Sequence, residues 1–235
     1  MPSASTLTEF KQAAAQAAVA HVTDGMIVGL GTGSTAALAV AALGKCVRQG
    51  LRVIGIPTSD ATAKQAHSLR IPLSTLAEHA EIDLTIDGAD EVELGTLNLI
   101  KGLGGALLRE KIVAGASARV IIIVDETKLV ERLGVHCAVP VEVVSFGWQS
   151  TARKLAQLGA NASLRKIAGG EPYITDGGHY ILDCAFEAIP SPEELGRRLD
   201  SVVGLVEHGL FVGMTSQVIV GGKNGVETLQ AMSRQ

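Results

Sequence analysis

The sequence has few aromatic residues and few cysteines. Phe, Trp and Tyr make up only 3% of the 235 residues, and the three cysteines lie far apart, at Cys46, Cys137 and Cys184. An odd number of widely spaced cysteines without a Cys-x-x-Cys pair gives neither a disulfide framework nor a zinc pattern. This cysteine usage is typical of a reducing compartment, so we expect a cytoplasmic protein.

The sequence also lacks a basic stripe and a long apolar run. The formal net charge is −4, and Lys and Arg do not gather in the way that nucleic-acid binding needs. Apolar runs fall short of the roughly 20 residues that a membrane span requires. The N-terminal segment carries an acidic residue early and has no long apolar core, which argues against a signal peptide. We therefore expect neither nucleic acid nor membrane as a partner.

What the first half does contain is an alternation of short β-branched runs with Ala-rich helical runs. We expect strands at residues 26–30, 52–56, 84–86 and 120–124, and helices at residues 10–22, 36–49, 61–69 and 106–114. A capping box at residues 6–9 is expected to start the first helix. This alternation favours an α/β fold with an open, mostly parallel, Rossmann-like sheet and helices on both faces.

The pattern changes after residue 143. We expect helices at residues 150–158 and 191–201 and strands at residues 162–165 and 180–185, with glycine-rich turns between them. This mixture is typical of a small α+β domain. The chain closes with an expected strand at residues 214–220 and a short helix at residues 225–232.

A glycine-rich loop between an expected strand and an expected helix indicates an anion site. Residues 27–37 read IVGLGTGSTAA. Glycine lets the backbone approach a ligand closely, and the N–H groups and positive dipole end of the helix attract an anion. Thr32, Ser34 and Thr35 add hydroxyl donors. The loop therefore predicts binding of a small anion such as phosphate.

The same loop fits the G-x-G-x-x-A form of the dinucleotide fingerprint, which alone is a weak signal. That fingerprint needs an acidic residue at the end of the next strand. Here the next strand, residues 52–56, runs into Pro57, Thr58 and Ser59, and Asp60 lies beyond the strand end. We therefore favour a phosphate over NAD and expect no cofactor.

Residues 85–112 hold the groups that a proton-transfer site needs. Asp87 and Asp90 share one loop, Lys101 starts a glycine-rich loop, and Glu110 follows about a turn or two into the next expected helix. Together they offer a base, an acid and a cation for developing negative charge. Any one of them could be an ordinary turn cap or a solvated side chain. As a set beside an anion loop, they indicate an active site.

The polar motifs share one position relative to the expected strands. GTGST follows the first strand, TSD the second, DGADE the third, and DETK the strand at residues 120–124. Ligands of open α/β sheets bind outside the carboxyl ends of the strands. The four motifs therefore point to one crevice.

These motifs resemble those of ribose-5-phosphate isomerase, type A. GTGSTA, TSDAT at residues 58–62, IDGADEV, the lysine–glycine loop with LLREKI, VDETKLV and PVEV occur in the order seen in that family. DGADE followed by K-G-x-G and REK at this spacing is specific to it, and the resemblance covers nearly the whole chain. It implies that the last strand returns to the first sheet. The expected domains are then residues 1–134 with 211–235, and an inserted domain at residues 135–210.

The resemblance implies an aldose–ketose isomerase that interconverts ribose 5-phosphate and ribulose 5-phosphate through an enediolate, in the non-oxidative pentose phosphate pathway. By the same resemblance, Glu110 moves the proton between C2 and C1. Asp87 serves the ring oxygen and the hydroxyls, Lys101 stabilises the enediolate, and Asp90 orients these groups. No metal is expected, because Lys101 can supply the positive charge.

The family's substrate contacts also carry over. They fall on Thr32, Gly33, Ser34, Thr35, Asp87, Gly88, Ala89, Asp90, Lys101, Gly102, Leu103, Gly104, Lys128 and Lys11. Leu103 departs from the family's usual unbroken glycine run, and leucine does not easily adopt a positive φ. This departure puts a backbone contact from Leu103 in question. The resemblance further implies a homodimer or a higher homo-oligomer.

Two other classes stay open from the sequence. A coenzyme A transferase-like enzyme of related fold would place a nucleophilic Glu after a glycine loop. A non-catalytic sugar-phosphate sensor would carry an added DNA-binding module, and neither a helix-turn-helix nor a basic N-terminal extension is recognisable. The Thr/Ser-rich loop favours isomerisation of a sugar phosphate over acyl transfer.

Overall fold

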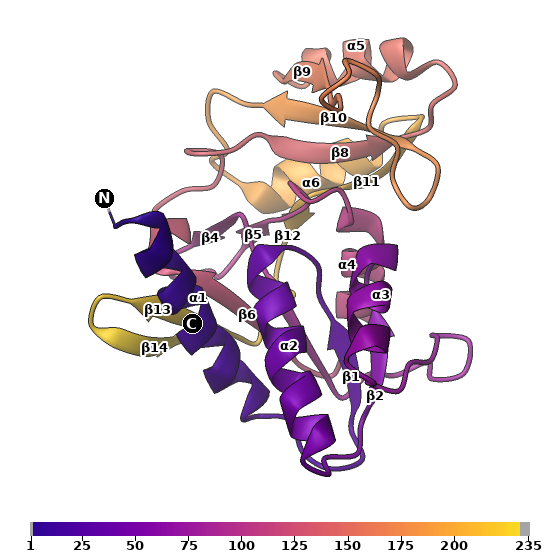
Figure 1. Ribbon diagram of the computed structural model, residues 1–235. Helices are drawn as coiled ribbons and strands as arrows, with labels where there is room; N and C mark the ends of the chain where they lie inside the picture. Colours follow the sequence, from indigo (N-terminus) through magenta and orange to yellow (C-terminus); the bar gives the residue numbers. More distant parts are fainter. Residues whose placement is uncertain (1, 231–235) are drawn as a thin grey trace.

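A six-stranded sheet forms the lower part of the molecule (Figure 1), in a computed structural model that describes residues 2–230. Its strands run in the order β14-β13-β6-β3-β1-β2, and all neighbours pair in parallel except β13 and β14. The strands are β1 (Ile27–Leu30), β2 (Ile54–Pro57), β3 (Leu84–Gly88), β6 (Val120–Asp125), β13 (Gln217–Gly222) and β14 (Gly225–Leu229). The predicted open, mostly parallel sheet is confirmed.

Helices cover this sheet because its central strands are apolar on both faces. In β6, Ile121 and Ile123 pack into a core with α1 (Ala4–Val19) and α2 (Ser34–Arg48). Ile122 faces the opposite side, in a core that includes Ala114 of α4 (Leu107–Gly115). Alternate side chains of one strand thus contact different layers.

The remaining helix of this part, α3 (Asp60–Ser68), follows β2 and begins with Ser59 as its N-cap. Ser59 accepts a hydrogen bond from the Thr62 N–H, so the TSDAT motif forms the helix start. In the part of the chain that the structure describes, none of the helices has both the length and the apolar character to cross a bilayer.

A second, antiparallel sheet lies in the upper part of Figure 1, with strands in the order β11-β8-β10-β9. It consists of β8 (Val139–Val143), β9 (Asn161–Leu164), β10 (Tyr180–Ala185) and β11 (Leu205–His208), packed with α5 (Trp148–Gln157) and α6 (Pro192–Asp200). Its core is separate and includes Val141, Leu155, Leu182 and Leu199. This is the expected α+β unit, and we keep residues 135–210 as its proposed limits.

A third, small sheet joins these two parts, with strands in the order β12-β5-β4-β7. The strands are β4 (Glu91–Glu93), β5 (Leu99–Ile100), β7 (Leu129–Val130) and β12 (Leu210–Phe211), and the short 3-10 helix η1 (Glu126–Lys128) precedes β7. This sheet was not predicted from the sequence, because strands this short show no alternation.

Two predicted elements were wrong in their limits or type. The first helix begins after Ser3, whose hydroxyl accepts from the Thr6 N–H, instead of after a capping box at residues 6–9. The expected helix at residues 225–232 is strand β14 as far as the described residues reach, and residues 231–232 lie outside them. Gly222 pairs with Gly225, so a two-residue loop, residues 223–224, makes a hairpin.

Helix α1 contacts β13 and β14 at one edge of this sheet. A Cβ added to Gly221 of β13 would lie 1.9 Å from the carbonyl oxygen of Phe10 in α1. Only glycine therefore allows the helix to approach the strand so closely. The contact places the next residue, Lys11, at the carboxyl end of the sheet, where its Nζ lies 3.8 Å from Asp125 Oδ2.

Candidate functional site

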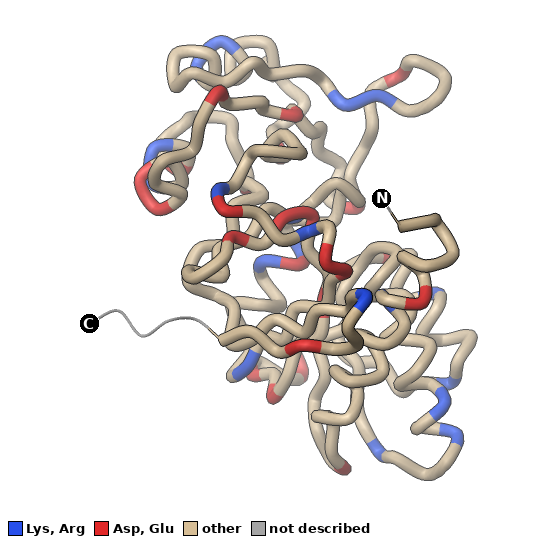
Figure 2. Tube along the Cα trace, turned by 90° about the vertical axis from the view of Figure 1, so that its left-hand side faces the viewer, with Lys and Arg blue, Asp and Glu red and all other residues tan. Residues whose placement is uncertain are grey.

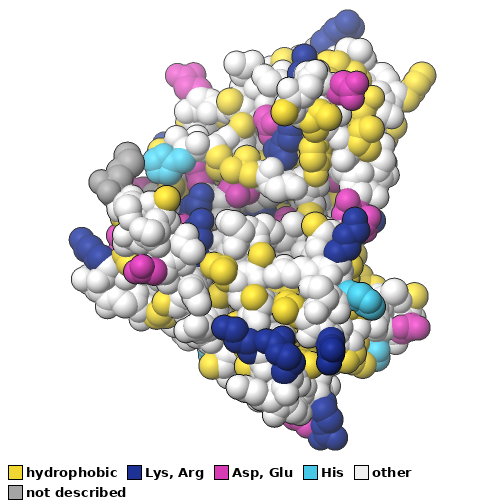
Figure 3. Space-filling view, in the orientation of Figure 1, with side chains coloured by type: hydrophobic (Ala, Val, Ile, Leu, Met, Phe, Trp, Pro, Cys, Tyr) yellow, Lys and Arg dark blue, Asp and Glu magenta, His cyan; other side chains and the backbone are white. Residues whose placement is uncertain are grey.

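One pocket lies at the carboxyl ends of β1, β3 and β6, and the surface in Figure 3 is hollowed where the upper and lower parts meet. The residues that line the pocket are Lys11, Thr32, Gly33, Ser34, Thr35, Gly88, Ala89, Asp90, Lys101, Gly102, Gly104, Glu110 and Lys128. Of the residues predicted to contact substrate or take part in proton transfer, only Asp87 and Leu103 are not among them. The structure therefore brings the separate motifs together.

Lys101 is a buried cation at the centre of this site. Its Nζ lies 2.9 Å from Asp87 Oδ2 and 3.5 Å from Glu110 Oε1, and it donates to the Gly88 carbonyl at 2.5 Å. It also lies 5.4 Å from the centre of the Phe211 ring. Burial alone would lower the pKa of Lys101, but the two carboxylates outweigh it and hold the pKa above its ordinary value.

Asp87 lies behind the pocket and joins Lys101 to the anion loop. Its Oδ1 accepts from the backbone N–H groups of Thr32 at 3.1 Å and Gly88 at 2.7 Å. Burial raises the pKa of Asp87, and the Lys101 ammonium opposes this rise. A Cβ on Gly31 would meet the Asp87 carboxylate at 2.1 Å, so glycine is needed there. Asp87 can therefore hold or release a proton beside a fixed cation.

Glu110 lies in the first turn of α4 and is only 4% exposed. Its Oε2 atom is buried and has no hydrogen-bond partner among the described residues. Burial raises the pKa of Glu110 from 4.5 to about 8, helped by the charges of Asp87 and Asp90 and opposed by Lys101. A carboxylate with a free oxygen and a pKa near neutrality is suited to accept and return a proton.

Asp90 holds the lysine–glycine loop. Its Oδ2 accepts from the Leu103 N–H at 3.0 Å. Within this loop the positive φ values fall on Gly102 (104°) and Gly105 (85°), whereas Leu103 has none. The leucine therefore fits where the family's usual sequence has glycine, and its backbone contact goes to Asp90.

The anion loop differs in detail from the sequence-based expectation. The Thr32 hydroxyl lies 2.7 to 3.0 Å from the hydroxyls of Thr58, Ser59 and Thr62. The backbone N–H of Thr32 already donates to Asp87 in β3. Thr32 therefore connects the loop after β1 both to the segment after β2 and to β3. The other groups of the loop and the first turn of α2 stay available to an anion.

Two lysines approach the same loop from elsewhere in the chain. Lys11 Nζ lies 3.5 Å from Ser34 Oγ. Lys128, at the end of η1, lines the pocket, and its side chain forms neither an ion pair nor a hydrogen bond with any residue between 2 and 230. Two cations near a helix N-terminus and hydroxyl groups form a site that suits a doubly charged phosphate.

Two side chains from the segment between β9 and β10 contact the lysine–glycine loop, and the sequence did not predict them. Arg165 donates to the carbonyls of Gly102 and Leu103, at 2.9 Å each. The Tyr173 hydroxyl donates to the Gly104 carbonyl at 3.4 Å. Neither residue belongs to a motif, and their sequence distance from Lys101 gives no signal.

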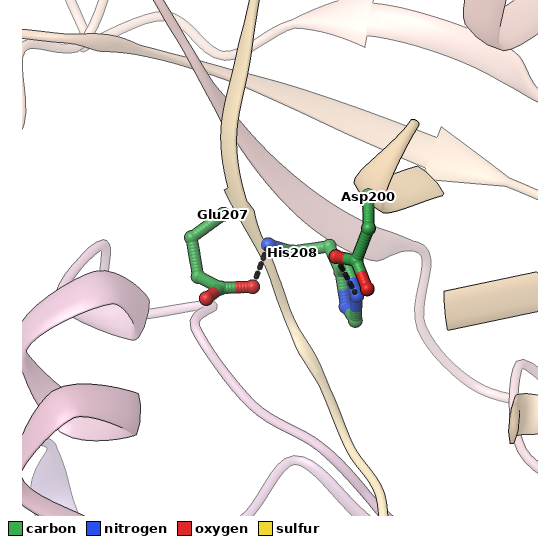
Figure 4. Close-up of side chains that lie close together, drawn as sticks. All are labelled: Asp200, Glu207 and His208. Carbon is green, nitrogen blue, oxygen red and sulfur yellow. Dashed lines mark hydrogen bonds and ion pairs between the residues drawn. The ribbon is translucent and has the colours of Figure 1, made fainter. Parts of the chain in front are cut away.

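Charged residues of both signs also mingle elsewhere at the junction of the upper and lower parts (Figure 2). One cluster there combines Asp200, Glu207 and His208, whose ligand atoms lie within 4.8 Å of one another (Figure 4). The Lys111 ammonium, however, lies 2.7 Å from Glu207 Oε1 and 3.4 Å from His208 Nδ1. Two of the three groups are therefore already in contact with a cation of the protein itself.

Comparison with known proteins gives a consistent result. The family model described as ribose 5-phosphate isomerase A (phosphoriboisomerase A) matches residues 54–225. Ribose-5-phosphate isomerase A of Gloeobacter violaceus is 64% identical over 219 residues, which cover 93% of this chain and 95% of that protein. The protein of the same name from a Synechococcus strain is 57% identical, over 94% and 97% of the two chains.

Solved structures agree with these relatives. The structure of ribose 5-phosphate isomerase A from Methanocaldococcus jannaschii superposes with a TM-score of 0.91 at 42% identity, covering 94% of this chain and 98% of that one. A D-ribose-5-phosphate isomerase in complex with phospho-erythronic acid superposes with a TM-score of 0.92 at 38% identity, over 95% and 99% of the two chains.

Proposed function

The chain belongs to the ribose 5-phosphate isomerase A family, and we propose that it interconverts ribose 5-phosphate and ribulose 5-phosphate, an aldose–ketose isomerisation. The observation that carries this proposal is the Glu110 carboxyl group. It is buried, its Oε2 atom has no partner among the described residues, and its pKa is raised to about 8. A buried carboxyl oxygen without a hydrogen bond destabilises the folded protein, so its presence indicates a role in contact with substrate.

We assign the proton transfer to Glu110. In the open-chain aldehyde, its carboxylate removes the proton from C2, and the C–H electron pair forms the C1–C2 double bond of an enediolate. The former carbonyl oxygen takes up the negative charge, which the Lys101 ammonium stabilises. Glu110 then returns the proton to C1, while C2 and its oxygen become the ketone.

Asp87 is proposed to move the proton between the two oxygens. The hydroxyl on C2 must lose a proton and the oxygen on C1 must gain one. A carboxyl group whose pKa burial raises, beside a fixed ammonium, can carry that proton. Opening of the furanose ring needs the same kind of transfer at the ring oxygen. Asp90 is assigned to orienting the lysine–glycine loop through the Leu103 N–H.

The phosphate is proposed to bind between the first turn of α2 and the two lysines. Ser34 and Thr35 offer hydroxyls there, and Lys11 and Lys128 offer cations. Phospho-erythronic acid, present in a related structure, carries one phosphate and one carboxylate. The pocket of this chain offers cations to both groups: Lys11 and Lys128 to the phosphate, and Lys101 to the carboxylate.

The alternatives that the sequence left open are not favoured. Close relatives over nearly the full chain are named as isomerases, which speaks against a coenzyme A transferase-like enzyme and a non-catalytic sugar-phosphate sensor. We also propose that the protein works in the cytoplasm as a homodimer or a higher homo-oligomer. Sedimentation at micromolar concentration would test this, and a single species of 24.3 kDa would contradict it.

The decisive experiment is a direct assay of the purified protein. We expect ribose 5-phosphate to be converted to ribulose 5-phosphate, and free ribose to be a far poorer substrate because the phosphate supplies binding energy. Acyl transfer from coenzyme A thioesters serves as the competing assay. Absence of isomerisation with active acyl transfer would replace the proposal with the transferase alternative.

A further inference from the structure

Two side chains of the segment between β9 and β10 hold three consecutive carbonyl groups of the lysine–glycine loop. Arg165 Nη1 donates to the carbonyls of Gly102 and Leu103, and the Tyr173 hydroxyl donates to the carbonyl of Gly104. A Cβ on Gly105 would lie 2.2 Å from the Tyr173 hydroxyl oxygen, so the loop and the segment between β9 and β10 are in close contact. All three carbonyls are therefore turned toward this segment.

This arrangement fixes the direction of the N–H groups that follow. The described peptide bonds are trans, and in a trans peptide the C=O and the next N–H point in opposite directions. The Gly102 carbonyl meets Arg165, and the Leu103 N–H on the opposite side meets Asp90 in the pocket wall. By the same geometry, the Leu103 carbonyl on Arg165 directs the Gly104 N–H toward the pocket.

The Gly104 N–H is free to bind a ligand. Gly104 lines the pocket, and within residues 2–230 its N–H has no hydrogen-bond acceptor. A Cβ added to Gly104 would meet no atom within 4 Å, so its surroundings are open. The neighbouring Lys101 ammonium makes this a place for an oxygen with negative charge.

Arg165 is itself held in one orientation. Its Nε donates to Asp183 Oδ2 at 3.0 Å, and its Nη2 pairs with Asp183 Oδ1. This bidentate contact uses one edge of the guanidinium and leaves Nη1 to the two carbonyls. The Arg165 side chain is only 13% exposed. A fixed donor fork of this kind can impose an orientation on a loop that contains several glycines.

We propose that Arg165 is a positioning residue for the isomerisation. It holds the Gly102 and Leu103 carbonyls away from the pocket, so that the Gly104 N–H and Lys101 together stabilise the oxygen that becomes negative in the enediolate. Tyr173 supports the same orientation at the next carbonyl. The inference rests on the proposed function, because it concerns charge that develops only during that reaction.

The test compares two Arg→Lys substitutions at matched ion pairs. Arg165→Lys keeps the charge beside Asp183 but loses the planar fork. Arg52→Lys does the same at the exposed pair with Asp24, where no loop carbonyl is bound. We expect Arg165→Lys to lower kcat about 10-fold or more, with KM for ribose 5-phosphate within about 3-fold, because the affected contact forms in the transition state. Arg52→Lys should leave both unchanged.

Two further readouts separate positioning from general loss of structure. Affinity for phospho-erythronic acid, measured by calorimetry, should fall with Arg165→Lys by about the same factor as kcat/KM, because its carboxylate carries the negative charge. In Arg165→Ala, millimolar guanidinium should restore part of kcat, whereas Arg52→Ala should not respond. If the substitution only lowered the amount of folded protein, the remaining active sites would bind the analogue with the parent affinity, and guanidinium would not restore kcat.

If Arg165→Lys does not fold, Tyr173→Phe provides the measurement, because it removes only one hydroxyl from the Gly104 carbonyl. It should lower kcat by about 2- to 5-fold without a matching change in KM. Parent-like kcat and analogue affinity in the folded variants would overturn the inference while the isomerase function stands. A parent protein that does not isomerise ribose 5-phosphate would overturn both.

Discussion

Glu110 Oε1 lies 3.5 Å from Lys101 Nζ, whereas Glu110 Oε2 has no partner among the described residues. One oxygen of the carboxylate is thus oriented by a buried cation and the other is left for a substrate. If cations paired with both oxygens of Glu110, they would hold its pKa low. If no group contacted the carboxylate, its orientation would not be fixed. The observed arrangement gives an oriented carboxyl group whose pKa lies near the working pH.

Replacement of Glu110 by Gln should stop catalysis without stopping binding. Gln keeps the shape of the side chain but cannot accept the C2 proton, so kcat should fall by a factor on the order of 10² to 10⁴. Exchange of the C2 hydrogen with solvent should be lost in parallel, as measured by NMR in D₂O. Glu227→Gln, at an exposed position on β14, is the control. A Glu110→Gln protein with parent rate would make Asp87 the candidate base.

The rate should depend on pH through Glu110. As a base it must be deprotonated, and its pKa is about 8. We therefore expect kcat/KM for ribose 5-phosphate to rise about tenfold per unit up to about pH 8 and then to level off. The profile should be measured at constant ionic strength. A flat profile between about pH 6 and pH 9 would contradict the assignment.

The raised pKa of Glu110 should also make the free energy of unfolding fall as the pH rises. In the folded protein Glu110 keeps its proton up to about pH 8, whereas an ordinary glutamate loses it near 4.5. Raising the pH between these values therefore destabilises the parent protein, because the folded state binds more protons. Glu110→Gln should gain stability relative to the parent as the pH rises from about 5 to 8.5. Urea unfolding measures this, and an unchanging difference would count against the raised pKa.

Substitution of Lys128 by Met should weaken binding of the phosphate. The phosphate does not change charge during the isomerisation, so the contact is equally strong in the ground and transition states. KM for ribose 5-phosphate should rise about 10-fold or more while kcat stays within about 2-fold. Lys64→Met, at an exposed position on α3, should leave KM unchanged. A change in kcat without a change in KM would contradict this assignment and indicate that Lys128 acts at the reacting carbons instead of the phosphate.

Activity should survive removal of divalent metal ions. The Lys101 ammonium lies where a metal would stabilise the enediolate, and Asp87 and Glu110 hold its pKa above the ordinary value. Dialysis against a strong chelator should therefore leave kcat unchanged. Loss of activity that a divalent ion restores would show that the charge on Lys101 is insufficient.

The sequence could predict the parts of the site that lie on motifs. Asp87 was predicted at the carboxyl edge of the sheet because DGADE follows a strand there. Lys101 and Glu110 were predicted to meet it because they lie on the adjacent glycine-rich loop and on the helix that this loop opens. Glu91 of the DGADE motif instead turns away and accepts from the backbone N–H groups of His136 and Cys137. A motif residue can therefore hold a loop, and sequence alone does not separate these roles.

Other features of the fold and the site were not predicted, because their sequence signals are weak or were overlooked. Arg165 reaches the lysine–glycine loop through a tertiary contact of the segment after β9, which no local pattern encodes. Residues 225–232 were predicted as a short helix, whereas residues 225–229 form strand β14. The Asn224–Gly225 pair at the start of this strand is a hairpin signal and should have taken precedence. The hydroxyl cluster around Thr32 needs the β1 and β2 loops to be adjacent, which only the sheet order decides.

The contact between Phe10 and Gly221 has a consequence for synthesis of the chain. Lys11 is brought to the pocket by a helix that rests on β13, a strand that is translated much later than the helix. Asp87, Lys101 and Glu110 are all translated well before that strand. The support that positions Lys11 therefore forms only after β13 has been made, and a chain that ends before Gln217 would keep Asp87, Lys101 and Glu110 without it.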